Sequence, residues 1–157
     1  MKLSHIRNIG LSALFALLTF SSAQSAMINV KSELPVSDVT ARLEAAIEKA
    51  GARIFTKVDF QQGVKSVGND IRPTTVLIFG IPKIGADAFA ISQTIGLYLP
   101  LRVLAYEDAS GQVWLSYPDP ADAAVEHGIP VNHPAIQAMQ GALKKLTMAA
   151  SGNSAGN

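Results

Sequence analysis

The residues best able to do chemistry in this chain are isolated polar side chains on otherwise apolar segments: Asp59, Lys83, Arg102 and Tyr106. A carboxylate can act as a general base, lysine and arginine can hold an anion, and a phenol can donate a hydrogen bond. These types predict a site for a small ligand, and two interpretations stay open. One is a non-catalytic binding or interaction module. The other is an enzyme on a small polar or anionic substrate, with Asp59 as base, Lys83 or Arg102 as anion clamp, and Tyr106 or Tyr117 as donor.

Recognisable catalytic patterns are missing from the sequence after residue 26. No serine there lies in a G-x-S-x-G or S-x-x-K pattern, which argues against a serine nucleophile. The segment from Gly80 to Gly85 superficially resembles a phosphate loop, but it lacks the Walker spacing, and Pro82 has no backbone N–H to offer an anion. We interpret it as a turn at the exit of a strand, and we assign no catalytic residue and no cofactor.

The histidines do not predict a metal site. His127 and His133 are six positions apart, with Gly128 and Pro130 between them, whereas a helical zinc pair needs a separation of three or four. The chain contains no cysteine that could complete a ligand set. We expect His127 to lie exposed at a helix end and His133 to cap a helix.

The first 26 residues follow the pattern of a secretory signal peptide. A basic leader with Lys2 and Arg7 precedes an uncharged apolar run, Ile9–Phe20, and then a stretch of small polar residues. The run of about 12 residues is short for a membrane span, which needs roughly 20. We therefore expect a cleaved leader and a periplasmic or secreted protein, with cleavage after Ser25, or nearby after Ala23 or Ala26.

Removal of that leader changes the charge balance. Without Lys2 and Arg7 the chain has 11 basic and 12 acidic residues, a formal charge of −1. The longest basic cluster is Lys144-Lys145, so neither nucleic acid nor an anionic membrane surface is expected as a partner. No membrane span is expected in the mature chain. We expect one domain over residues 27–149, stabilised without disulfides, and a disordered polar tail over residues 150–157.

Hydrophobic periodicity predicts an alternation of strands and helices along this domain. Ser37 is the expected N-cap of the first helix, Gly51 its end, and residues 61–70 a loop or a short helical turn. The predicted strands are 27–32, 53–60, 74–79, 101–107 and 112–117, and the predicted helices 38–50, 86–95, 121–127 and 134–148. This order predicts an α+β fold, an antiparallel sheet with helices packed on one face.

Strand parity gives the fourth strand two different faces. Arg102, Leu104 and Tyr106 share one face, and the other face is purely apolar. The mixed face is either the wet side of the sheet or the wall of a cleft in which Arg102 meets a carboxylate such as Asp59.

Several motifs in fixed order carry a resemblance to a known family. They are RPTTVLIFGIPK at residues 72–83, LPLRVLAYED at 99–108, GQVWLSY at 111–117 and Asp119-Pro120. The chain resembles the domain-of-unknown-function family 302 over essentially the whole mature domain. The resemblance implies a single-copy fold like that of the TATA-box-binding protein and a homodimer, and it brings no settled activity.

Two positions depart from that family's usual pattern. Phe60 follows Asp59 where members often have His, and Ile81 stands where many have Asn. An activity that used those polar atoms would be lost or altered here. We therefore favour an exported, non-catalytic homodimeric binding or interaction module whose partner is a second copy, a small ligand or a periplasmic protein.

Overall fold

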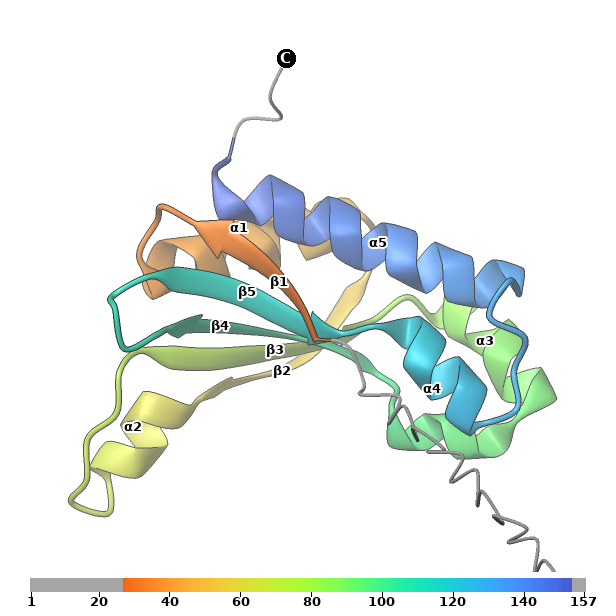
Figure 1. Ribbon diagram of the computed structural model, residues 1–157, viewed down its shortest axis with the longest axis horizontal. Helices are drawn as coiled ribbons and strands as arrows, with labels where there is room; N and C mark the ends of the chain where they lie inside the picture. The colour runs from red at the N-terminus through yellow and green to blue at the C-terminus, as the bar shows by residue number, and fades with distance from the viewer. Residues whose placement is uncertain (1–26, 154–157) are drawn as a thin grey trace, which may run out of the picture.

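The computed structural model describes residues 27–153, which form a five-stranded antiparallel sheet with helices (Figure 1). The strands are β1 (Met27–Ser32), β2 (Arg53–Asp59), β3 (Thr74–Gly80), β4 (Leu101–Glu107) and β5 (Val113–Pro118). Their order in the sheet is β1-β5-β4-β3-β2, so β1 and β2 form its two edges. The expected signal peptide lies outside the described residues.

Two long helices cover one face of this sheet (Figure 1). Helix α1 (Val36–Lys49) packs against β2, β3 and β4, while α5 (Pro134–Ser151) packs against β1 and β5. Helix α1 turns Val39, Leu43 and Ile47 inward at helical spacing, and all three are fully buried. They meet the inward side chains of the strands in the main core. The predicted α+β fold with helices on one sheet face is therefore confirmed.

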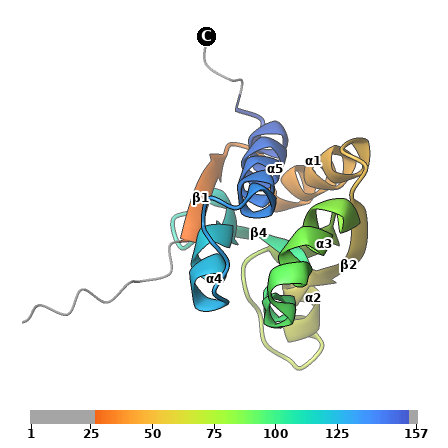
Figure 2. The ribbon, with the colours of Figure 1, turned by 90° about the vertical axis from the view of Figure 1, so that its right-hand side faces the viewer.

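The remaining helices gather at the two ends of the sheet. Helix α3 (Pro82–Ile91), the 3₁₀ helix η1 (Gln93–Leu97) and α4 (Pro120–Glu126) lie at one end, together with the start of α5 (Figure 2). There they enclose a second apolar cluster that includes Ile95, Ile136 and Met139. The short helix α2 (Phe60–Lys65) projects from the opposite end (Figure 1).

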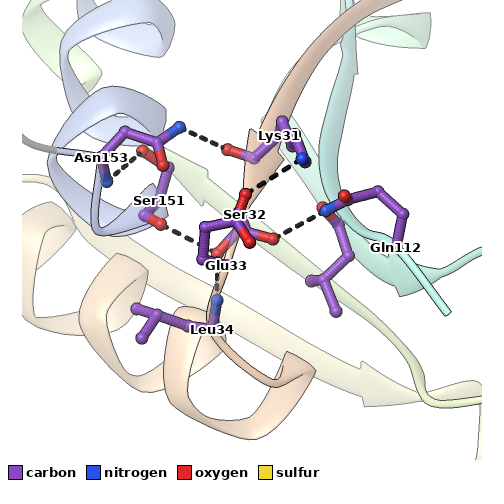
Figure 3. Close-up of polar contacts among 8 residues, drawn as sticks. Lys31, Ser32, Glu33, Leu34, Gln112, Ser151 and Asn153 are labelled. Atoms are coloured by element: carbon purple, nitrogen blue, oxygen red, sulfur yellow. Dashed lines mark hydrogen bonds and ion pairs between the residues drawn. The ribbon is translucent and has the colours of Figure 1, made fainter.

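Hydrogen bonds between β1 and the end of α5 hold the C-terminal helix in place (Figure 3). The buried Ser32 hydroxyl donates to the Ser151 carbonyl at 2.9 Å and accepts the Leu34 N–H at 3.1 Å. The side-chain amide of Asn153 donates to the Lys31 carbonyl at 2.8 Å. The sequence-based boundary of the tail is therefore too early, because residues 150–153 belong to the packed domain. The rest of the expected tail, residues 154–157, lies outside the described part of the chain.

The carboxylate of Asp59 accepts the Gln62 N–H at 2.9 Å and starts α2, the short helical turn that is one of the two alternatives expected over residues 61–70. Local structure departs from the sequence-based expectations in two further places. Pro35, not Ser37, is the N-cap of α1, and the Ser37 hydroxyl instead donates to the Asp38 side chain. The helix expected over residues 86–95 begins earlier, at Pro82, and is interrupted at Ser92, where η1 begins.

A β-bulge in β2 also changes which side chains share a face. Ile54 pairs with Phe79 and Thr56 pairs with Ile78, so Phe55 is the extra residue. Simple alternation would group Ile54 with Thr56 and Val58 on one face. The bulge instead turns Ile54 toward the helices and leaves Phe55 at the sheet margin with half of its surface exposed.

Candidate functional site

A cavity lies between the end of the sheet and α3. Its volume is about 330 Å³, near the lower end of the range for small-molecule sites. Every lining side chain is apolar. The lining residues are Phe55, Gly80, Ile81, Pro82, Ile84, Gly85, Ala86, Phe89, Leu99, Pro100, Leu101 and Met139. We call this cavity the apolar pocket.

The pocket lies at the end of the sheet where β3 ends and where β2 and β4 begin. Gly80 closes β3 opposite Arg53 of β2, and the chain then turns through Ile81 and Pro82 into α3. Pro82 occupies the first turn of the helix, where its missing N–H costs no hydrogen bond. A cis peptide joins Leu99 to Pro100, and both residues line the pocket. The expected strand-exit turn therefore forms one wall of a cavity.

Two aromatic rings shape the pocket. The Phe89 ring packs beside Gly96, where an ideal Cβ would lie 3.2 Å from Phe89 Cε1. The Phe55 ring carries the guanidinium of Arg53, whose Cζ lies 5.6 Å from the ring centroid, a cation–π contact. Both rings remain partly exposed, Phe55 at 50% and Phe89 at 42%. The sequence shows the phenylalanines, but the bulge that carries Phe55 to the pocket has no clear sequence signal.

The four residues expected to bind a ligand do not converge on this pocket. Lys83 is exposed in the first turn of α3, next to the lining residue Pro82. Asp59 caps α2 at the other end of β2, and Tyr106 stands far along β4, opposite Thr74 and Trp114. Arg102 borders a separate, much smaller cavity of about 30 Å³. Their roles in binding stay predictions, but a shared active site is not formed.

The proposed meeting of Arg102 with Asp59 does not occur. Arg102 pairs in register with Ile78, while Asp59 pairs with Thr75 and, through it, aligns with Ala105. Three positions along a strand and two strand spacings separate the two residues, roughly 14 Å. The Arg102 side chain forms no hydrogen bond or ion pair with the described residues. The face of Arg102, Leu104 and Tyr106 predicted from parity is confirmed by the register with β3.

A polar network borders the small cavity on its helical side. Tyr98 donates a short hydrogen bond to the Glu126 carboxylate, and this bond is the main reason that the pKa of Tyr98 is raised. Beside it, Thr94 Oγ1 lies 2.7 Å from His127 Nδ1, and the two rings of Tyr98 and His127 meet edge to face. His127 Nε2 is buried without a hydrogen bond to the described residues. His127 is the C-cap of α4, which confirms the expected helix end, but it is half-buried, which corrects the expectation that it is exposed.

His133 lies at the start of α5, where it is expected to cap the helix. His133 Nδ1 accepts the Ala135 N–H at 3.3 Å, which confirms His133 as the cap of α5. Within residues 27–153, no group of three or more histidine, cysteine, aspartate or glutamate side chains is placed to hold a metal ion. The helices in that same range also lack the combined length and apolar character that crossing a membrane requires.

Comparison with known proteins places this architecture in a family. The model of DUF302, a domain of unknown function, matches residues 28–146. The chain belongs to the DUF302 family. A crystal structure of an uncharacterized conserved DUF302 protein from Bacillus stearothermophilus has the same fold, with a TM-score of 0.72 at 16% identity, over 79% of this chain and 97% of that chain.

Curated relatives of this DUF302 protein carry a more specific name. The chain is 37% identical over 134 residues to the fluoride-specific ion channel FluC 1 of Brucella suis, covering 85% of this chain and 53% of the relative. The FluC 1 protein of Brucella abortus matches with the same identity, over 50% of its length. The chain thus spans about half the length of these relatives.

Proposed function

We propose that this DUF302 protein is an exported, non-catalytic homodimeric binding module, and that the apolar pocket is its binding site. The observation that carries the proposal is the pocket itself: an open cavity of about 330 Å³ lined by apolar side chains. Burial of apolar surface there would stabilise a complex by about 25 cal/mol per Å² removed from water. A polar ligand would lose hydration without receiving hydrogen bonds from these side chains.

The enzyme alternative receives less support. It required Asp59, Lys83 and Arg102 to meet around one substrate, and they occupy separate regions of the fold. Asp59 already accepts a backbone hydrogen bond as the cap of α2. Asp59 is also far from Lys83 and Arg102, the two candidate anion clamps. One small substrate could therefore not contact the base and a clamp together.

Fluoride is the ligand that the relatives' name suggests, but the pocket favours a different one. A small, strongly hydrated anion needs N–H or O–H donors to replace its water, and no lining side chain carries such a donor. We therefore assign this chain the binding of apolar groups and not the conduction named for the relatives.

A thermal-shift and calorimetry screen tests the pocket. Octanol should raise the melting temperature in a concentration-dependent way, because a ligand that binds only the folded state stabilises it. Sodium fluoride, compared with sodium chloride at equal ionic strength, should not. Ala86→Trp, which fills the pocket from an exposed position on α3, should abolish the octanol shift, and Ala149→Trp on α5 serves as its control. No octanol binding to the unchanged protein would remove the proposal.

For the homodimer, edge strand β2 is the surface we propose. Its outer edge is unpaired and six of its seven residues are exposed, including Phe55 and Val58. Such an edge is suited to pairing with another strand. An antiparallel pair about Val58 would set Lys57 opposite Asp59 of the partner subunit, twice by symmetry. Lys57 Nζ lies 3.0 Å from Glu44, so it would stand between two carboxylates.

Light scattering after size exclusion tests this arrangement. The unchanged protein should have the mass of two chains, and Val58→Glu should have the mass of one, because it adds a charge at the centre of the pairing. Val125→Glu on α4 is the matched control. Val125 is also exposed, and α4 follows β5, which lies three strands away from β2 in the sheet. A monomeric mass for the unchanged protein would contradict the homodimer.

A further inference from the structure

The margin of the apolar pocket carries positive charge without a matching acid. The Arg53 guanidinium lies over the outer ring of the pocket, Phe55, at 5.6 Å from the ring centroid. Lys83 is exposed on the turn that begins with the lining residue Pro82. Neither cation forms an ion pair or a donated hydrogen bond with another residue of the described range.

Acidic residues near this margin are too few to neutralise it. Asp87 lies one turn beyond Lys83 on α3, and no ion pair joins the two within the described part of the chain. With Arg53, Lys83 and Asp87 counted, the margin keeps a net positive charge. The ion pairs of the described residues involve other lysines: Lys31 with Glu33, Lys57 with Glu44 and Lys65 with Asp70.

The start of α3 adds to the same field. Its N-cap residue, Ile81, lines the pocket and makes no side-chain cap hydrogen bond. Pro82 has no N–H, and the Ile84 N–H donates to the Ile81 carbonyl at 2.9 Å, which leaves the Lys83 N–H as the donor of the first turn. The N-terminal end of a helix carries a partial positive charge that favours an anion nearby. Two cations and an uncapped helix start therefore surround the mouth of a cavity whose walls are hydrocarbon.

We propose that the apolar pocket binds an amphipathic acid, with its hydrocarbon body inside the pocket and its single anionic head group between Arg53 and Lys83. This inference rests on the proposed function and adds the class of ligand. The body supplies the burial energy, and the head group remains at the exposed margin, where it keeps part of its hydration. A fully polar anion lacks the burial energy of the hydrocarbon body. A neutral alcohol lacks the attraction between an anionic head group and the two cations.

Calorimetry with three ligands that share one tail tests the assignment: octanoate, octanol and octylamine, each below the concentration at which it aggregates. Octanoate should bind about tenfold more tightly than octanol, and octylamine more weakly than either. The preference for octanoate should shrink as salt rises from about 50 to about 500 mM, because exposed charges are screened.

Paired substitutions separate this inference from the proposed function. In Arg53→Gln/Lys83→Gln, the affinity for octanoate should fall to that for octanol, so that the ratio of the two affinities approaches one. Lys144→Gln/Lys145→Gln makes the same change in net charge on α5 and should keep the preference. Equal binding of octanoate and octanol to the unchanged protein, or a preference that survives loss of both margin cations, overturns the amphipathic acid but leaves an apolar binding module. Failure of both ligands to bind overturns both.

Discussion

The Phe55 ring lies directly against the Cα of Gly80, so closely that an ideal Cβ at Gly80 would be 3.0 Å from Phe55 Cε2. The two residues come from neighbouring strands, and the β2 bulge places the ring over the end of β3. A glycine at position 80 thus permits the ring to form one side of the pocket. The width of the pocket depends on this contact.

Gly80→Ala should therefore alter the pocket more than the fold. The added methyl group must displace the Phe55 ring, which is half exposed and free to move, so we expect a change of at most about 1 kcal/mol in the free energy of unfolding. Octanol affinity should fall, as measured by calorimetry alongside urea unfolding. Gly63→Ala is the control, because nothing lies within 4 Å of the added Cβ. Unchanged octanol affinity in Gly80→Ala would show that the Phe55 ring does not shape the site.

Regular alternation within a strand could be predicted from the sequence, but the bulge in β2 could not. Alternation in Leu101–Glu107 predicted both faces of β4, because each strand residue points to the face opposite its neighbour's. The same rule failed in β2, where one extra residue at Phe55 reverses the alternation. No residue type requires a bulge, so alternation alone could not locate it.

The candidate site was harder to predict for a related reason. Polar residues attract attention in a sequence, and Asp59, Lys83 and Arg102 were chosen for their chemistry. The pocket is instead made of apolar side chains from four separate segments, and apolar residues in a sequence usually indicate core. Only the three-dimensional arrangement shows that some of them line a cavity. Lys83 was predicted as a site residue and does lie beside the pocket, next to Pro82.

The hairpin between β4 and β5 should make stability depend on pH through Asp108. Its carboxylate accepts hydrogen bonds from the Ser110 hydroxyl at 2.6 Å and the Trp114 indole at 2.8 Å, and also from the backbone of Ser110 and Gln112. These bonds favour the ionised form and hold the pKa of Asp108 far below its ordinary value of 3.8. The folded state thus gains stability above that ordinary value and loses it progressively as pH falls below it.

Urea unfolding from about pH 7 to about pH 2 measures this contribution. Asp108→Asn should be less stable than the unchanged protein at neutral pH, and the difference should shrink on acidification, since the carboxyl then becomes protonated in the unchanged protein. Asp70→Asn is the control, because among residues 27–153 that carboxylate makes only an exposed ion pair with Lys65 at 3.7 Å. A stability difference for Asp108→Asn that is constant with pH would contradict the assignment.

The buried hydroxyl of Ser32 should matter for the attachment of the C-terminal helix. Ser32→Ala removes both the donor to the Ser151 carbonyl and the acceptor for the Leu34 N–H (Figure 3). An unpaired buried polar group costs about 1–3 kcal/mol, and we expect a loss of that size in the free energy of unfolding. Amide hydrogen exchange should also accelerate in the last turn of α5. Ser37→Ala, which removes an exposed hydroxyl on α1, should change neither.

Two glycines, one at the end of α5 and one inside it, should respond in opposite directions to the same substitution. Gly152 ends the helix with a φ of 76°, and an ideal Cβ there would lie 2.8 Å from Leu34 Cδ1. Gly152→Ala should therefore lower the free energy of unfolding by about 1–2 kcal/mol for the left-handed backbone alone, with the contact to Leu34 adding to the loss. Gly141 lies inside the same helix with open space around its added Cβ. Gly141→Ala should raise stability by up to about 1 kcal/mol, because alanine is the better helix former. Urea unfolding of both variants decides the point, and equal effects of the two substitutions would contradict the helix end described here.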